Sequence, residues 1–254
     1  MRRHQGYCDS VSRCRVTACS GPTPATEKEV STVVLGRLTE LDFDAVIFDM
    51  DGTLIDSTPA VIRAWTIWAK EHGVTAEQLA GHHGMPSAGV VRRLLPEHQH
   101  ESAIDRINAL EIDDVHDIVV LPGAVDALEA LASARSAIAT SCTLPLARAR
   151  IAAAQLTPPS VLVTADQVEH GKPAPDPFLL AAERLGVSPR RCLVVEDAPA
   201  GLVAAEAAGC YRLAVITTTR EEDLVADGIV RNLGDVEFVL GADGSIRVRA
   251  RSSW

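Results

Sequence analysis

Aromatic residues are scarce in this chain of 254 residues, of which only 4% are Phe, Trp or Tyr. Because 47% is hydrophobic, a core has to be built mainly from Ala, Val, Leu and Ile. The chain also lacks an apolar run of the roughly 18 residues that a transmembrane helix requires. Its basic start, MRRHQ, is not followed by the apolar segment of a secretory signal. We therefore expect a cytoplasmic protein with one large domain or two unequal ones.

Positive charge is also in short supply, since 24 Lys and Arg stand against 34 Asp and Glu, a formal net charge of −10. A chain this acidic is a poor match for nucleic acid or for an anionic membrane surface, and we expect neither as a partner. A small anionic substrate stays compatible with this composition, because a bound metal ion can invert the sign of the local charge.

The cysteines do not form the pattern of a disulfide framework. They are Cys8, Cys14, Cys19, Cys142, Cys192 and Cys210. The last three lie in apolar sequence and are expected to be reduced thiols. The first three lie in a polar stretch, their spacing matches no closed zinc site, and we expect no function for them. Residues 1–40 are accordingly interpreted as a disordered leader.

From residue 45 onward, short apolar runs alternate with helical stretches rich in Ala and Leu. The runs are 45–51, 136–141, 160–164, 191–197 and 212–216, and the helical stretches between them are 123–134, 144–156, 176–186 and 200–209. Strands that alternate with helices favour right-handed βαβ units and a parallel sheet covered on both faces. We predict a Rossmann-like α/β core domain formed by residues 41–57 and 122–254.

A helical segment interrupts this alternation after the first strand. Residues 58–121 contain several amphipathic stretches, beginning with PAVIRAWTIWAKEHG, and no strand-like run of comparable strength. The segment is predicted to form an all-helical cap domain inserted into the core. An insertion next to a strand end is well placed to act as a lid.

Polar side chains follow four of the predicted strands at the point where each strand ends. They are Asp49 and Asp51, then Ser141, then Lys172, and finally Glu196 and Asp197. Because the carboxyl ends of parallel strands meet at one edge of the sheet, we expect these side chains to converge. Several carboxylates and one amine would repel one another unless a hard cation lay among them, and oxygen ligands suit Mg²⁺.

Such a site can transfer a phosphoryl group. Asp49 can attack phosphorus to form an aspartyl-phosphate, and Asp51 can protonate the leaving oxygen and later deprotonate water. Lys172 can offset the negative charge of the phosphoryl group. Three further groups are expected to contact the phosphate: Gly52, which allows a close backbone approach, the hydroxyl of Ser141 and the backbone N–H of Cys142.

The ordered set DxDGT, TS, KPxPD and EDxxAG, spread over residues 44–240, resembles the haloacid dehalogenase (HAD) superfamily of phosphohydrolases. This resemblance implies that Asp49 is both nucleophile and Mg²⁺ ligand and that Asp51 is the general acid and base. It also implies that Asp51 binds Mg²⁺ through its backbone carbonyl, Asp197 binds directly, and Glu196 assists through water. The helical insertion then corresponds to the α-helical cap of that superfamily.

Three stretches are similar to bacterial sugar-phosphate and glycerol-phosphate phosphatases: HGMPSAGVVRRL (83–94), AIATSCTLPLARARI (137–151) and VVEDAPAGLVAAEAAGC (194–210). The similarity implies hydrolysis of a small sugar or polyol phosphate, with His83 touching the substrate. The expected partner is a small phosphorylated metabolite, and the protein is expected to be a monomer or a weak dimer.

Two alternatives remain open at this stage. A phosphosugar mutase of the beta-phosphoglucomutase type would carry a histidine at the cap hinge, where this chain has Val61. A non-catalytic phosphate-binding regulator would have no need for an acid/base such as Asp51. Dehalogenases lack this second aspartate, so cleavage of a carbon–halogen bond is not expected.

Overall fold

The apolar runs form a single parallel sheet in a computed structural model that describes residues 33–82 and 84–251. The sheet has six strands in the order β5-β4-β1-β6-β7-β8, and every neighbouring pair is parallel. They are β1 (Ala45–Phe48), β4 (Ser136–Ala139), β5 (Val161–Val163), β6 (Cys192–Glu196), β7 (Tyr211–Val215) and β8 (Gly228–Val230). Five correspond to the predicted runs, whereas the short edge strand β8 was not predicted.

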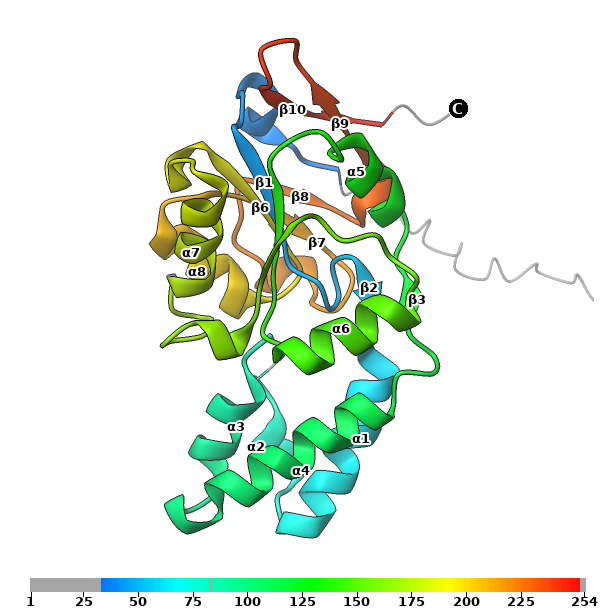
Figure 1. The fold of residues 1–254 in the computed structure, drawn as a ribbon, viewed down its shortest axis with the longest axis vertical. Coiled ribbons are helices and arrows are strands. Elements are labelled where there is room, and N and C mark those ends of the chain that lie inside the picture. Colours follow the sequence, from blue (N-terminus) through cyan, green and yellow to red (C-terminus); the bar gives the residue numbers. More distant parts are fainter. Residues whose placement is uncertain (1–32, 83, 252–254) are drawn as a thin grey trace, which may run out of the picture. The chain divides into compact units, whose positions relative to one another are not determined.

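Helices cover both faces of this sheet, which confirms the predicted α/β architecture (Figure 1). They are α5 (Ala124–Ala130), α6 (Leu144–Ala153), α7 (Asp176–Leu185) and α8 (Pro199–Ala208). Side chains of β1 alternate between the two faces, as the strand geometry requires. Val46 and Phe48 pack on the side of α5 and α6, while Ala45 and Ile47 pack on the side of α7 and α8.

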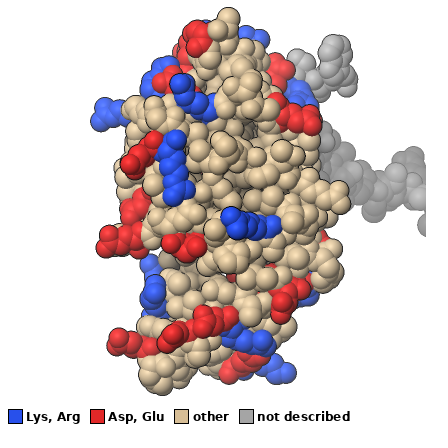
Figure 2. All heavy atoms as spheres, in the orientation of Figure 1, with Lys and Arg blue, Asp and Glu red and all other residues tan. Residues whose placement is uncertain are grey.

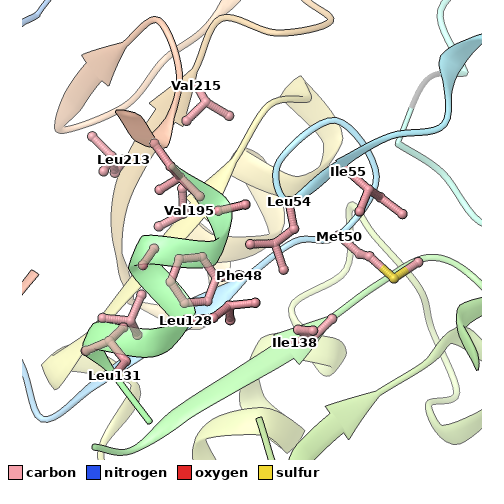
Figure 3. Packing of buried hydrophobic residues seen from close by; sticks show 14 of the residues in the cluster. Phe48, Met50, Leu54, Ile55, Leu128, Leu131, Ile138, Val195, Leu213 and Val215 are labelled. Carbon is pink, nitrogen blue, oxygen red and sulfur yellow. The ribbon is translucent and has the colours of Figure 1, made fainter. Parts of the chain in front are cut away.

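The larger core lies on the side of α5 and α6 (Figure 3). Phe48 lies at its centre, with Leu128 and Leu131 beside it on the α5 side. Its ring meets that of Phe238 edge to face, with 5.9 Å between the centroids. Phe238 belongs to an antiparallel hairpin of β9 (Val236–Leu240) and β10 (Ile246–Ala250), which the sequence analysis did not predict. Aliphatic side chains supply most of the remaining core, as the composition indicates.

Residues 33–40 belong to the folded core, so the predicted leader boundary at residue 40 is too late. The backbone of Val34 pairs with that of Ile229, and the side chains of Leu35 and Leu38 are buried. The segment 33–40, VVLGRLTE, is too short for its apolar residues to show a period in the sequence. The three N-terminal cysteines, Cys8, Cys14 and Cys19, lie outside the described residues.

The helical segment leaves the core and returns to it through a two-stranded ribbon. Strands β2 (Ile55–Asp56) and β3 (Val119–Val120) pair antiparallel, and between them lie α1 (Thr58–His72), α2 (Ala76–Leu79), α3 (Ser87–Leu94) and α4 (His100–Asp113). The segment has its own buried cluster, in which the indole N–H of Trp68 donates to the carbonyl of Ala103 at 2.8 Å. These helices lie below the carboxyl edge of the sheet in Figure 1.

Short 3₁₀ turns complete the described chain: η1 (Gly36–Glu40), η2 (Glu97–Gln99), η3 (Ala165–Gln167), η4 (Pro189–Arg191), η5 (Glu221–Asp223) and η6 (Leu233–Asp235). Figure 2 shows acidic and basic side chains interspersed on one face of the molecule. Exposed ion pairs of this kind contribute little to stability individually. Among the described residues, no helix has the length and apolar character needed to cross a membrane.

Candidate active site

The predicted polar residues follow four adjacent strands of the sheet, at the same edge. Asp49 follows β1, Ser141 follows β4, Lys172 lies in the loop after β5, and Glu196 and Asp197 end β6. Since β5, β4, β1 and β6 are neighbours in that order, their ends lie next to one another. The convergence inferred from the alternating pattern is therefore present in the structure.

Lys172 joins two carboxylates in what we call the lysine cluster, composed of Lys172, Asp49 and Glu196. Its ammonium group donates to Asp49 Oδ1 at 2.5 Å and to Glu196 Oε1 at 2.7 Å. The lysine is only 2% exposed. Burial by itself would lower the pKa of Lys172, but the two carboxylates outweigh this and raise it above its usual value. The ammonium group is therefore charged at neutral pH.

The other oxygen of Glu196 fixes the loop that follows β6. Glu196 Oε2 accepts from the backbone N–H groups of Asp197 and Ala198, both at 2.8 Å. Helix α8 can approach this carboxylate because position 201 is glycine: a Cβ on Gly201 would lie 1.6 Å from Glu196 Oε1. Glu196 therefore orients Lys172 and the backbone beside Asp197.

The donor set fits a hard divalent cation. Asp49, Glu196 and Asp197 are all buried, and each offers a carboxylate oxygen within 4.8 Å of the others. Burial raises the pKa values of Asp49 and Glu196, and Lys172 opposes the shift in both. One lysine against three carboxylates leaves this buried site short of positive charge, which a Mg²⁺ ion would supply.

Gly52 allows the turn after Asp51 to pass close to Asp197. It has a φ of +87°, and a Cβ there would lie 2.2 Å from Asp197 Oδ2. The hydroxyls of Thr53 and Thr218 both donate to the Asp197 carboxylate, and that of Thr217 donates to the Gly52 carbonyl. These contacts hold the Asp51–Gly52 turn against the end of β6.

Asp51 lies in a second group, which we call the arginine cluster: Asp51, Arg150, Cys142 and Glu111. The Arg150 guanidinium donates to Asp51 Oδ1 at 2.8 Å, to the Cys142 sulfur at 3.2 Å and to Glu111 Oε1 at 3.1 Å. The Cys142 thiol donates to Asp51 Oδ2 at 3.0 Å. The Ser57 hydroxyl, just before the helical insertion, donates to Asp51 Oδ1 at 2.6 Å.

Arg150, Cys142 and Glu111 of the arginine cluster are buried, whereas the Asp51 side chain is 23% exposed. Burial raises the pKa of the Cys142 thiol well above its usual value, and Asp51 adds to the effect, so this cysteine is a neutral donor. Burial would lower the pKa of Arg150, but Asp51, Cys142 and Glu111 together outweigh it and raise that pKa. Arg150 therefore carries a permanent charge between a carboxylate of the core and one of the insertion.

Two of the predicted phosphate contacts have other hydrogen bonds in this structure. The Ser141 hydroxyl donates to the carbonyl of Gly84 in the insertion at 2.8 Å. The backbone N–H of Cys142 donates to the Thr140 hydroxyl at 3.1 Å. Their roles at a phosphate stay predictions. His83 lies outside the described residues.

A cavity of about 620 Å³ lies between the strand ends of the core and the helical insertion. From the core, its lining includes Asp49, Asp51, Gly52, Ser141 and Cys142. From the insertion, it includes Val61, Trp65, Leu79, His82, Met85 and Val90. A polar floor under a largely apolar roof suits a small ligand with one strongly charged end.

Sequence reasoning missed Arg150 and Glu111, although both sit at regular positions in buried helix faces. Arg150 shares the buried face of α6 with Leu146 and Ile151, and Glu111 follows Ile107 at a spacing of four on α4. A charged residue at a core position was the available signal. Burying such a residue requires a partner, which the sequence alone did not identify.

A second acidic group lies between α4 and β3, where the chain returns to the core. Asp114, His116 and Asp117 come close enough to share a cation. The guanidinium of Arg63 already bridges the two aspartates, with contacts of 2.7 Å and 2.8 Å. Arg63 therefore supplies the positive charge that this group needs, and the group at the strand ends stays the stronger candidate for a metal.

Comparisons of this chain with known proteins find similarity to hydrolases and phosphatases. A family model described as haloacid dehalogenase-like hydrolase matches residues 43–209. Hexitol phosphatase A of Escherichia coli is 45% identical over 175 residues, 66% of this chain and 81% of the relative. Glycerol-1-phosphate phosphohydrolase 1 of Saccharomyces cerevisiae is 33% identical, over 70% of this chain and 76% of the relative. A hydrolase structure from Pseudomonas syringae superposes with a TM-score of 0.70 at 27% identity, covering 76% of this chain and 95% of that one.

Proposed function

Because this chain belongs to the haloacid dehalogenase-like hydrolase family, we propose that it is a Mg²⁺-dependent phosphatase acting on a small sugar or polyol phosphate. The resemblance seen in the four motifs is thereby confirmed. The observation that carries the proposal is the placement of Asp49: its carboxylate is buried against Lys172 and also lines the cavity beneath the helical insertion. The similarity to a hexitol phosphatase and a glycerol-1-phosphate phosphohydrolase supports the substrate class.

The proposed reaction has two steps. Asp49 attacks the phosphorus of the bound ester and becomes an aspartyl-phosphate, while Asp51 gives a proton to the departing alcohol oxygen. Asp51 then takes a proton from water, and that water releases phosphate and restores Asp49. Lys172 balances the negative charge gathered around Asp49 in both steps.

Asp49 and Asp197, the backbone carbonyl of Asp51, and Glu196 acting through water would hold Mg²⁺. When bound, the cation supplies positive charge that lets an anionic ester approach an anionic nucleophile. Ser141, Gly52 and the backbone around Cys142 would contact the phosphoryl oxygens. Ser141 would first exchange its bond to Gly84, so binding of phosphate is coupled to the loop of the insertion.

We further propose that residues 58–121 act as a cap domain over the core. Ser141 and Gly84 join the two by a hydrogen bond, and Gly171 in the core lies against Pro86 of the insertion so closely that a Cβ would come within 2.3 Å of its ring. A cap in this position excludes water while the ester is bound and opens to release the product.

The test is release of inorganic phosphate from a panel of sugar, polyol and short-acid phosphates, assayed with Mg²⁺ and with a chelator. We expect turnover of sugar or polyol esters that is lost with the chelator. Absence of phosphate release from every ester in the presence of Mg²⁺ would reject the proposal.

The product of glucose 1-phosphate separates the hydrolase from the phosphosugar mutase. Val61, in place of a hinge histidine, lies on α1 and lines the cavity, which favours release of free phosphate. Formation of glucose 6-phosphate would favour the mutase instead. Membership in a hydrolase family leaves the non-catalytic regulator without support.

A further inference from the structure

Arg150 is an unusual residue for its position. It lies on a helix face shared with Leu146, Ala147 and Ile151, and it is only 2% exposed. Its Nε is buried without a hydrogen-bond partner in the described part of the chain. Burial of a guanidinium group is costly unless its partners compensate, so packing alone does not explain an arginine here.

The hydrogen-bond partners of Arg150 indicate what this residue does. The Arg150 guanidinium donates one hydrogen bond to Asp51 and another to the Cys142 sulfur. The Cys142 thiol in turn donates to Asp51. With Ser57, three donors thus surround the Asp51 carboxylate and restrict its rotation. An acid/base is effective only when its oxygen is held within reach of the proton that it transfers.

Glu111 extends this arrangement into the helical insertion. It lies in the last turn of α4, and its carboxylate is the other partner of Arg150, at 3.1 Å. Both Arg150 and Glu111 line the cavity. Arg150 therefore contacts the core and the insertion at once, and its position depends on how the insertion is seated.

On the basis of the proposed function, we infer that Arg150 is a positioning residue that aims Asp51 at the leaving-group oxygen, and that Glu111 makes this aim depend on the seating of the helical insertion. Neither residue touches the phosphorus. Their effect reaches the reaction through the Asp51 carboxylate, and it concerns the proton given to the leaving group.

The inference predicts a dependence on the leaving group. An alkoxide such as that from glycerol 1-phosphate needs protonation as it departs, whereas p-nitrophenolate leaves readily without it. We expect Arg150→Lys, which keeps the charge and loses the forked geometry, to lower kcat/KM for glycerol 1-phosphate by about 100-fold. For p-nitrophenyl phosphate, we expect a loss of less than about 5-fold. Arg148→Lys, at an exposed position of the same helix, should leave both values unchanged.

Glu111→Gln tests the link to the insertion and retains Arg150. It should lower kcat/KM for glycerol 1-phosphate by about 10-fold and show the same preference for the ester with the better leaving group. The double variant should be no worse than Arg150→Lys alone, because Glu111 acts through Arg150. If Arg150→Lys does not fold, as judged by circular dichroism, Glu111→Gln decides the matter by itself.

Equal losses for the two esters in a folded variant would overturn the inference, since a merely structural role affects both alike. Independent, multiplying effects in the double variant would overturn the part assigned to Glu111. If the wild-type protein with Mg²⁺ hydrolyses neither these two esters nor any other of the panel, the proposed function itself fails, and this inference fails with it.

Discussion

The lysine cluster and the arginine cluster each pair an aspartate of the DxD motif with a buried cation, but they are built from different parts of the molecule. Asp49 and Glu196 lie at strand ends of the α/β core, and Lys172 lies in the loop that follows β5. Arg150 pairs Asp51 of the core with Glu111 of the helical insertion. The residues of the first cluster all belong to the core, whereas the second cluster also requires the insertion to be in place.

In the proposed mechanism, this difference separates the two chemical tasks. A nucleophile has to be ready before the substrate arrives, so it benefits from a fixed site. Protonation of a leaving group is useful only when the ester is enclosed, so it benefits from a link to the part that encloses it. The predictions below test whether the two clusters differ in this way.

The largest effect is expected for Asp49→Asn, because an amide cannot form the aspartyl-phosphate. Phosphate release should fall by at least about 10³-fold, as it does when a nucleophile is removed from other enzymes. Asp44→Asn, at the opposite end of β1, is the matched control and should retain activity. Substantial turnover by Asp49→Asn, measured on the best ester of the panel, would reject Asp49 as nucleophile.

Lys172→Met should weaken the core itself, because it leaves the buried carboxylates of Asp49 and Glu196 without their ammonium partner. Loss of one partner from a buried ion pair costs about 3–5 kcal/mol of unfolding free energy. Urea unfolding measures the loss, and the exposed Lys70→Met is the control. Addition of Mg²⁺ should recover part of it, since a ligand of the folded state stabilises that state. If the unfolding free energy of Lys172→Met equals that of wild type, the core does not depend on the Lys172 ammonium group for its stability.

Gly84→Ala probes the contact between the insertion and the core. Gly84 has a φ of +77°, and a Cβ there would lie 2.7 Å from the Cβ of Ala198. Gly73→Ala is the matched control, because its φ is +68° and nothing lies within 4 Å of the added atom. Both should lose about 1 kcal/mol of stability. Only Gly84→Ala should also lose activity, by about 10-fold in kcat/KM; equal kinetics in the two variants would show that this contact does not affect catalysis.

The smallest effect concerns the pH dependence of stability at Glu111. Burial raises the pKa of its carboxyl above the ordinary value of 4.5, although Arg150 opposes the shift. The protonated form therefore stabilises the fold, and this contribution is lost as pH rises from about 4.5 through the raised value.

Gln cannot ionise, so the advantage of wild type over Glu111→Gln in unfolding free energy should shrink as pH rises. The change is about 1.4 kcal/mol for each unit by which the pKa is raised. Urea unfolding at several pH values between about 4 and 8 measures it. If the wild-type advantage in unfolding free energy grows with pH instead, the attraction of Arg150 for the Glu111 carboxylate outweighs the effect of burial. The charges of the arginine cluster would then be balanced as well as those of the lysine cluster.

Much of the fold could be predicted because its signals are local. Each central strand is a continuous apolar run, as strands buried on both faces require, and the stretches between them are rich in Ala and Leu, which favour helices. Strand β8 escaped prediction because it has only three residues, and β9 and β10 escaped because they alternate apolar with polar residues instead of forming continuous apolar runs. The burial of Leu35 and Leu38 depends on contacts with distant residues, which a local pattern does not record.

The sequence by itself determined the lysine cluster. Asp49, Lys172 and Glu196 each follow a strand, and the rule that parallel strands end at one edge was enough to bring them together. Only the tertiary structure decided the arginine cluster, because Arg150 and Glu111 lie on helices, where periodicity tells which face is buried but not what that face meets. Which helix of the insertion packs against which helix of the core is a property of the whole fold, and it is this packing that gives Asp51 its surroundings.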